Sequence, residues 1–414
     1  MTSVCFYFQV HQPFRLNPHS IFDIGSGKSY FGVSDGTDLD NQAIMNKVAT
    51  KCYRPMTQLL LELLERHPQF RVSFSITGTA LEQFRQFAPD VIELFRALAA
   101  TGRVEFLNET YHHSLAFIHS PEEFTRQIRM HTEAMEEVFG VTPTVFRNTE
   151  LIYNNDLAAI VSKLGFRGML AEGADHILGW RSPNFVYHSR GDTALPLLLK
   201  NYKLSDDIAF RFGEKTWESY PLTAATFANW VNSNHGAGDV VNLFMDYETF
   251  GEHQWEDTGI FSFMRELPTE LYRHPDTRFA TPSDVLADHA PVGEIDAPQY
   301  VSWADVERDL SAWHSNEMQA DALRSVFALE SDVIASGDEQ LIDDWRRLTT
   351  SDHFYYMCTK WFADGDVHTY FNPYQSPYDA FIAYMNVLHD VQLRIDEIKA
   401  RRVNGEPVSL RKVT

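Results

Sequence analysis

The sequence is poor in the features that define several large classes of protein. It has only 3 cysteines among 414 residues, and no two of them form a CxxC pair. Neither a disulfide framework nor a zinc site built from thiolates is therefore indicated. No apolar run approaches the roughly 20 residues that a membrane-spanning helix needs. We also find no internal repeat and no low-complexity segment.

Basic residues are scarce as well. The chain has 35 lysines and arginines against 57 aspartates and glutamates, which gives a formal net charge of −22 at pH 7. Because nucleic acids and anionic membranes bind clusters of positive charge, this balance argues against both as partners. The N-terminal Met1-Thr2-Ser3 leads directly into an apolar stretch, without the basic region that opens a signal peptide. We therefore expect a cytoplasmic protein.

What the sequence does contain is a regular alternation of β-rich and helical stretches, from the N-terminus to about residue 290. Most of the β-rich runs are continuously apolar, which is typical of parallel strands covered on both faces. Stop signals such as Gly102 and Gly165 bound the helices between them. This alternation predicts a parallel sheet or barrel with its site at the carboxyl ends of the strands. The predicted strands are Val4–Val10, Val72–Thr77, Val104–Leu107, Thr144–Phe146, Gly168–Ala171, Leu197–Lys200 and Val240–Met245.

The pattern changes after about Pro298, where only helical spacing remains. We therefore divide the chain into an α/β domain over residues 1–297 and a helical domain over residues 298–414. The segment from Phe14 to Lys51 lacks periodicity and follows the first strand, so we expect it to be an active-site loop. The predicted C-terminal helices are Trp303–Trp313, Met318–Ala335, Glu339–Leu348, Phe354–Phe362 and Tyr378–Lys399.

Polar side chains gather at the ends of several predicted strands. Because the carboxyl ends of parallel strands meet at one edge, a shared pocket explains this pattern best. Asp246 directly follows an apolar run and is the strongest functional candidate, whereas Glu248 and Glu252 would suit a solvent-facing helical turn equally well. The other strand ends supply His11, Glu105, the segment Asn108 to His113, and Arg147 to Glu150.

Metal-assisted hydrolysis is one chemistry that such a pocket could support, as in a metal-dependent deacetylase. No helical HxxxH pair is present, however, and Pro13 stands where metal-dependent barrels commonly carry the aspartate of a His-x-Asp pair. We therefore expect no metal and no other cofactor. The candidate ligands beside Asp246 would be His11, His112, His113 and His253.

Cleavage of a glycosidic bond by two carboxylates is the other chemistry. Glu150 lies close in sequence to Arg147 and Asn148, which would keep it ionised and nucleophilic. Asp246 follows a strongly apolar strand, which should favour its protonated form and suit it to proton donation. The structural alternatives are a surface salt bridge between Glu150 and Arg147, and a helix cap for Asp246.

Five short segments, in this order along the chain, resemble the motifs of glycoside hydrolase family 57, in its α-amylase-type branch. Each segment alone is weak, but the ordered set spans residues 11 to 313. The resemblance implies an incomplete (β/α)7 barrel followed by a C-terminal α-helical bundle that completes the active-site cleft. The segments are His11–Pro13, Gly102–Glu105, Phe146–Glu150, Met245–Glu248 and Ser302–Trp313.

The resemblance also implies a role for each candidate residue. Glu150 would be the nucleophile of a retaining mechanism and Asp246 the acid/base, with no required metal. The substrates would be malto-oligosaccharides or glycogen- and starch-like α-1,4-glucans. A 4-α-glucanotransferase would use the same residues, and a non-catalytic glucan-binding protein is a further alternative, which the presence of both carboxylates disfavours. The implied substrate-binding residues are His11, Glu105, His112, Trp303, Asp309 and Trp313.

Overall fold

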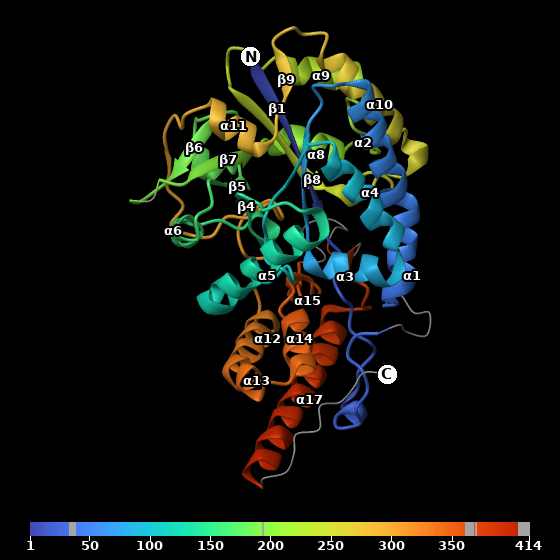
Figure 1. The fold of residues 1–414 in the computed structure, drawn as a ribbon, viewed down its shortest axis with the longest axis vertical. Helices are drawn as coiled ribbons and strands as arrows, with labels where there is room; N and C mark the ends of the chain where they lie inside the picture. The colour runs from blue at the N-terminus through green and yellow to red at the C-terminus, as the bar shows by residue number, and fades with distance from the viewer. Residues whose placement is uncertain (33–38, 193, 361–367, 369–370, 405–414) are drawn as a thin grey trace. The chain divides into compact units, whose positions relative to one another are not determined.

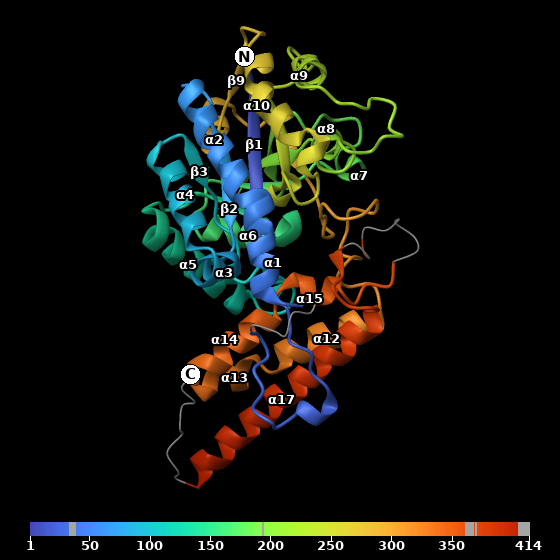
Figure 2. The same cartoon turned by 90° about the vertical axis from the view of Figure 1, so that its right-hand side faces the viewer.

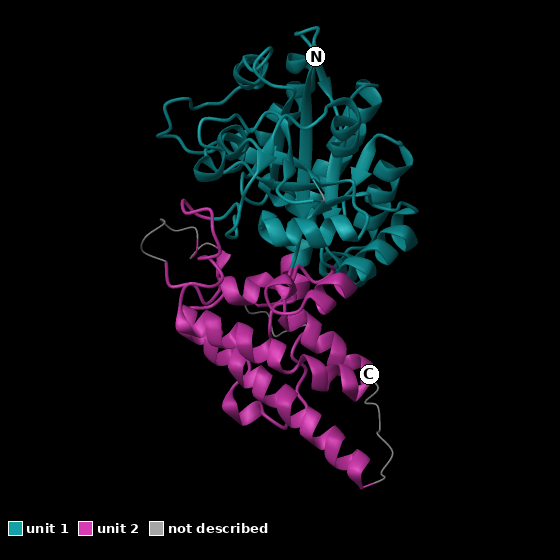
Figure 3. Ribbon diagram, turned by 90° about the vertical axis from the view of Figure 1, so that its left-hand side faces the viewer, with its two compact units in different colours: residues 1–12, 45–110, 128–304 teal, residues 13–44, 111–127, 305–414 magenta. Residues whose placement is uncertain are grey.

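The structure is a computed structural model, and it describes residues 1–32, 39–192, 194–360, 368 and 371–404. Contacts divide the chain into two compact units (Figure 3). Unit 1 contains residues 1–12, 45–110 and 128–304, and unit 2 contains residues 13–44, 111–127 and 305–414. Each unit is thus assembled from separate stretches of sequence, whereas the division predicted after residue 297 leaves both domains continuous.

A parallel sheet forms the first part of unit 1. Its strand β1 (Thr2–Val10) lies between β2 (Val72–Ile76) and β8 (Val240–Asp246), and β3 (Val104–Phe106) pairs with the far edge of β2. The short β9 (Thr277–Phe279) pairs with the first residues of β1. Every residue of β1 is buried, as the continuous apolar run predicted. The strands predicted in this sheet are confirmed to within two residues at each end.

A second sheet holds the remaining strands of unit 1. Strands β4 (Val145–Arg147), β5 (Gly168–Glu172) and β7 (Pro196–Lys200) are mutually parallel neighbours, and all three were predicted. Strand β6 (Val186–Ser189) pairs antiparallel with β7, and β10 (Glu294–Ile295) extends the edge beyond β6. The sequence analysis missed β6, β9 and β10.

Backbone pairing connects the two sheets at two places. Asn108, just after β3, forms a parallel bridge with Phe146 of β4. Asn201, just after β7, donates its backbone N–H to the carbonyl of Asn242 in β8 at 2.9 Å. Because β3 and β4 run parallel across this bridge, the carboxyl ends of both sheets face the same side. The predicted polar segments follow the strands on that side.

Helices of unit 1 follow most of its strands. Helix α2 (Arg54–Arg66) packs against both α4 (Pro89–Ala100) and α10 (Ile260–Leu271) beside the parallel sheet (Figure 1, Figure 2). Apolar side chains from both sheets, such as Leu170 and Phe244, meet in one buried core cluster. The other helices that lie entirely in unit 1 are α3 (Gly78–Phe87), α6 (Asn155–Lys163), α7 (Asp175–Leu178), α8 (Tyr202–Ala209), α9 (Ala224–Asn232) and α11 (Pro282–Asp288).

Two helices contain residues of both units. Helix α5 (Pro121–Phe139) starts in unit 2 and continues into unit 1, and α1 (Asn41–Val48) does the same. The presence of α1 corrects the prediction of a loop over Phe14 to Lys51, since its last third is helical. Residues 33–38 of that loop lie outside the described residues.

Unit 2 is helical in its described C-terminal part, and two of the predicted helices there are confirmed. Helix α14 (Glu339–Leu348) has the predicted bounds, and α17 (Pro377–Val403) contains the predicted Tyr378–Lys399. The helix predicted over Met318–Ala335 is instead two, α12 (Glu317–Ala328) and α13 (Glu330–Ser336). Among the described residues, no helix combines the length and apolar character needed to cross a membrane.

Two other helix predictions are corrected by the structure. Helix α15 (Ser351–Tyr355) ends where the predicted helix Phe354–Phe362 has barely begun, and residues 361 and 362 lie outside the described residues. The predicted helix Trp303–Trp313 is wrong, because this segment forms turns. Asp305 and Arg308 both have a φ of 54°, and left-handed residues break the ladder of helical hydrogen bonds.

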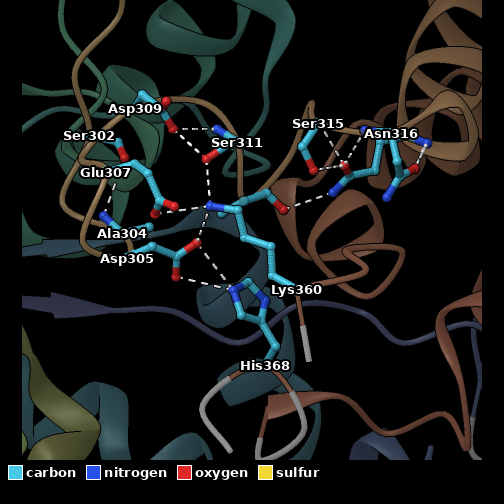
Figure 4. Close-up of polar contacts among 12 residues, drawn as sticks. Ser302, Ala304, Asp305, Glu307, Asp309, Ser311, Ser315, Asn316, Lys360 and His368 are labelled. Carbon is cyan, nitrogen blue, oxygen red and sulfur yellow. Dashed lines mark hydrogen bonds and ion pairs between the residues drawn. The ribbon is translucent and has the colours of Figure 1, made fainter. Parts of the chain in front are cut away.

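Polar contacts hold the part of this segment that belongs to unit 2 (Figure 4). Asp309 accepts hydrogen bonds from the backbone N–H and the hydroxyl of Ser311 at 2.8 and 2.5 Å. Asp305 pairs with Lys360 at 3.3 Å and with His368 at 3.1 Å. Side-chain contacts within this segment, and with Lys360 and His368 outside it, thus take the place of helical backbone bonds.

Candidate active site

Asp246 ends strand β8 and lies beside a buried polar network. It is half-buried and stands directly across from Gln9 of β1. The amide of Gln9 donates to the carboxylate of Glu109 at 3.0 Å, and Gln9 accepts from the hydroxyl of Tyr7 at 2.8 Å. The carboxyl ends of β1 and β8 thus place polar side chains together, as predicted from the strand ends.

Glu248 lies two residues beyond Asp246 and is buried, with a side chain only 5% exposed. This rules out the alternative of a solvent-facing position. Its carboxyl group accepts a hydrogen bond from the hydroxyl of Tyr53 and another from the backbone N–H of His11. Burial, and then the charge of Asp246, raise the pKa of Glu248 to about 8 in spite of these bonds. The protonated form of Glu248 is therefore favoured, next to the candidate acid/base.

The raised pKa of Glu248 predicts how the stability of the fold depends on pH. The folded chain binds this proton more tightly than the unfolded chain. The contribution of Glu248 to the free energy of unfolding is therefore full below about pH 4 and is lost as the pH rises through about 8. In Glu248→Gln the side chain keeps the shape of the protonated form but cannot ionise. Urea unfolding of both proteins from about pH 5 to about pH 9 should show the wild type losing several kcal/mol relative to this variant. Parallel stability curves for the two proteins would contradict the assignment.

His11 lies at the same place, immediately after β1. Its Nδ1 is 3.0 Å from the hydroxyl of Thr77, which follows β2, and its backbone contacts Glu248 as described. His11, one of the predicted substrate-binding residues, thus shares a neighbour with Asp246, because both interact with Glu248.

Glu150 follows β4 in a backbone conformation that L-amino acids rarely adopt. Its φ and ψ are 57° and 26°, and the next residue, Leu151, has a φ of 51°. Each such residue costs roughly 1–3 kcal/mol, and strain of this kind concentrates at functional sites. The carboxylate of Glu150 accepts a hydrogen bond from the indole N–H of Trp303 at 2.8 Å. The structure therefore brings together two residues that the motifs singled out separately.

The surface salt bridge considered for Glu150 and Arg147 is not formed. Arg147 is completely buried, and none of its guanidinium nitrogens has a hydrogen-bond partner among the described residues. Its guanidinium instead lies over the ring of Trp303, 4.7 Å from the ring centre. The same ring also faces the ammonium group of Lys200 at the end of β7, at 5.4 Å.

Tyr7 connects the surroundings of Glu150 with those of Asp246. Burial raises the pKa of its hydroxyl, the positive charge of Arg147 lowers it, and the charges of Glu109 and Asp246 raise it again. Tyr7 therefore lies within electrostatic reach of groups from β4, from the segment after β3, and from β8. Asp246 thus acts on Tyr7 directly. Glu150 is linked to Tyr7 through Trp303 and Arg147, whose guanidinium lies 6.0 Å from the centre of the Tyr7 ring.

Glu105 has a structural partner in the first turn of helix α11. Its carboxylate accepts from the backbone N–H of Ser283 at 2.9 Å and from the hydroxyl of Ser283 at 2.6 Å. Burial raises the pKa of Glu105, although both bonds favour its ionised form. These contacts explain Glu105 as a cap for α11, and its assignment to substrate binding remains a prediction from sequence.

The other predicted substrate-binding residues belong to unit 2. His112 is buried, with its Nε2 3.8 Å from the carboxylate of Asp343. Trp313 is only 1% exposed, so its ring is packed inside the unit. Asp309 is held by Ser311 as described above. For these three residues a role in substrate binding also remains a prediction.

Sequence reasoning missed the contacts that organise this site. The bond between Trp303 and Glu150 spans 153 residues, and that between Tyr53 and Glu248 spans 195. Only the position of Trp303 in the fifth motif signalled its importance, and nothing in the sequence singled out Tyr53, Lys200 or Tyr7.

Comparison with known proteins identifies the family of this chain. The model of glycosyl hydrolase family 57 matches residues 5–298, which include Glu150 and Asp246. A protein of Methanocaldococcus jannaschii, provisionally named as an alpha-amylase, is 42% identical over 410 residues, which are 96% of this chain and 86% of that protein.

Solved structures of related enzymes share the fold. The GH57-type branching enzyme of Pyrococcus horikoshii matches with a TM-score of 0.66 at 13% identity, over 100% of this chain and 98% of that chain. The 4-alpha-glucanotransferase of Thermococcus litoralis matches with a TM-score of 0.58 at 16% identity, over 89% of this chain and 54% of that chain. At such low identity the likeness concerns the fold alone. The family match and the relative from M. jannaschii go further: this chain belongs to glycosyl hydrolase family 57 and is a glycoside hydrolase, as its motifs predicted.

Proposed function

We propose that this enzyme cleaves α-1,4-glucosidic bonds in malto-oligosaccharides and in glycogen- or starch-like glucans, with retention of the anomeric configuration. The observation that carries the proposal is that two carboxylates lie at carboxyl ends of strands in unit 1: Glu150, held by Trp303, follows β4, and Asp246 ends β8. Family membership and a relative named as an alpha-amylase support the choice of substrate.

In the proposed mechanism the two carboxylates have separate tasks. Asp246 donates a proton to the glycosidic oxygen while Glu150 attacks the anomeric carbon, which leaves a β-linked glycosyl-enzyme. Asp246 then takes a proton from water, and this water attacks the same carbon from the opposite face to release an α-anomer. The indole N–H of Trp303 holds the carboxylate of Glu150 in place. The strained backbone of Glu150 fixes the direction in which this carboxylate points.

We also propose that the parallel strands of unit 1 form an incomplete (β/α)7 barrel and that the helices of unit 2 form a bundle. Two backbone contacts between the sheets support the barrel. The bridge between Asn108 and Phe146 links the end of β3 to β4, and the hydrogen bond between Asn201 and Asn242 links the end of β7 to β8. Active sites at the carboxyl ends of barrel strands are the general rule for such folds. The proposed catalytic residues follow β4 and end β8, as that rule expects.

Products formed from maltoheptaose test this function directly. Chromatography should show shorter malto-oligosaccharides, and proton NMR of the first turnover should show the α-anomer of the new reducing end. Initial β-anomer would overturn the retaining mechanism. Products longer than maltoheptaose would mean that a sugar hydroxyl replaces water as acceptor, as in a 4-α-glucanotransferase. Binding of maltopentaose by calorimetry without any turnover would identify a non-catalytic glucan-binding protein.

A further inference from the structure

Trp303 occupies an unusual electrostatic position. Its indole N–H donates to Glu150 at 2.8 Å, while its ring faces two cationic groups, Arg147 at 4.7 Å and Lys200 at 5.4 Å. Both distances lie within the range in which a cation is attracted to an aromatic face. The same ring therefore binds positive charge on its π system and a carboxylate at its edge.

Arg147 is the stronger source of positive charge in this arrangement. It is 0% exposed, and its guanidinium nitrogens have no hydrogen-bond partner within the described part of the chain. The ring of Tyr7, 6.0 Å away, is its other aromatic neighbour. A buried charge without hydrogen bonds is expensive, and a neutral residue of similar volume would be better for stability. The presence of arginine here therefore points to a function that needs the charge.

Lys200 contributes less, because anions already compensate it. Its ammonium group bonds to Asp206 of α8 at 3.0 Å and lies 3.8 Å from Glu172 of β5. Two further charged groups near Tyr7 are Glu109 after β3 and Asp246 of β8, which both raise the pKa of the Tyr7 hydroxyl. The net effect of Lys200 at the ring is thus smaller than that of Arg147.

We propose that Trp303 is a positioning residue for Glu150, and that Arg147, stacked on the indole ring, strengthens the N–H group that holds the carboxylate. A cation on the face of an aromatic ring draws electron density from it, so the ring N–H becomes a better donor, and hydrogen bonds to a charged acceptor are the stronger ones. This role differs from the sugar-binding role expected from the motif. It deepens the proposed function, because it rests on Glu150 acting as the nucleophile.

Replacing Trp303 by phenylalanine tests this role, since it removes the N–H but keeps an aromatic face for the cations and for a sugar. Carbon-13 NMR of labelled glutamate follows the titration of Glu150, and the Glu150→Gln variant assigns its signal. In Trp303→Phe this titration should move to higher pH, because the ionised carboxylate loses a hydrogen-bond donor. On malto-oligosaccharides kcat should fall about 10- to 100-fold with little change in KM, and the acidic limb of the rate profile should move with the titration.

Trp345→Phe in α14 is the matched control. Trp345 is fully buried, whereas Trp303 is partly buried. The indole N–H of Trp345 likewise donates a hydrogen bond, to the carbonyl of Val326 at 2.8 Å, but this bond lies in unit 2. The control should lose similar stability to urea without moving the titration of Glu150. An unchanged titration of Glu150 in Trp303→Phe, or a raised KM with unchanged kcat, would overturn the proposal in favour of a sugar-stacking role.

Arg147→Met tests the contribution of the cation and serves if Trp303→Phe does not fold. The Glu150 titration should again move to higher pH, while stability to urea should not fall. In the double variant with Trp303→Phe the combined shift should be smaller than the sum of the single shifts. Additive shifts, or a large loss of stability in Arg147→Met, would refute the coupling through the ring. The NMR titration does not depend on turnover, so the two proposals fail in different ways. Inactive wild-type protein would reject the proposed function, whereas an active wild type with an unchanged Glu150 titration in the variants would reject this inference alone.

Discussion

Replacing Glu150 by alanine should abolish the cleavage of every α-glucan substrate, because no glycosyl-enzyme can form without the nucleophile. The loss should exceed the roughly 10²- to 10⁴-fold that proton transfer by a positioned side chain typically contributes. It should be equally severe for an aryl α-maltoside with a good leaving group, since the missing step is the attack itself and not the departure of the leaving group. Initial rates with maltoheptaose and with 4-nitrophenyl α-maltoside measure both effects.

Azide and a matched variant complete this experiment. In Glu150→Ala, azide can enter only from the face that the carboxylate has vacated, and the product should be the β-azide. Glu252→Ala is the control: this carboxylate follows the same strand as Asp246 but pairs with Lys47 at 2.7 Å and with Lys51 at 3.3 Å. It should retain most activity. Substantial glucan cleavage by Glu150→Ala would remove Glu150 from the role of nucleophile.

The parallel strands could be predicted because burial on both faces leaves a clear trace in the sequence. A run such as Val240–Met245 is apolar at nearly every position, and in the structure it forms β8 with one further residue, Asp246. The turn segment Trp303–Trp313 shows the limit of this reasoning. Its spacing is compatible with a helix, but the left-handed Asp305 and Arg308 and the contacts of Asp309 with Ser311 decide its conformation.

The positions of the candidate carboxylates could also be predicted, because strand ends in an α/β fold define one edge. Their immediate environment could not. The left-handed backbone at Glu150 and Leu151 has no glycine to signal it, and the partners of Glu150 and Glu248 lie 153 and 195 residues away in the sequence. Such contacts depend on how the whole chain folds and leave no local pattern.

Replacing Asp246 by alanine should produce a different defect, in which the first step depends on the leaving group. The variant lacks only proton transfer, so cleavage of maltoheptaose should fall by about 10²- to 10⁴-fold. With 4-nitrophenyl α-maltoside the leaving group departs without a proton, and Glu150 should still be glycosylated. The intermediate should then accumulate, because water has lost its general base. A burst of 4-nitrophenol and the mass of the glycosylated protein would record it.

Azide distinguishes the two carboxylates most sharply, because it is a nucleophile that needs no general base. In Asp246→Ala it should restore turnover of the aryl maltoside and attack the β-linked glycosyl-enzyme, so that the product is the α-azide. The two variants should therefore give azides of opposite configuration. If Asp246→Ala gave the β-azide and Glu150→Ala the α-azide, Asp246 would be the nucleophile and Glu150 the acid/base. Either result is decided by the geometry of attack at one carbon, and it does not depend on how far each variant slows the reaction.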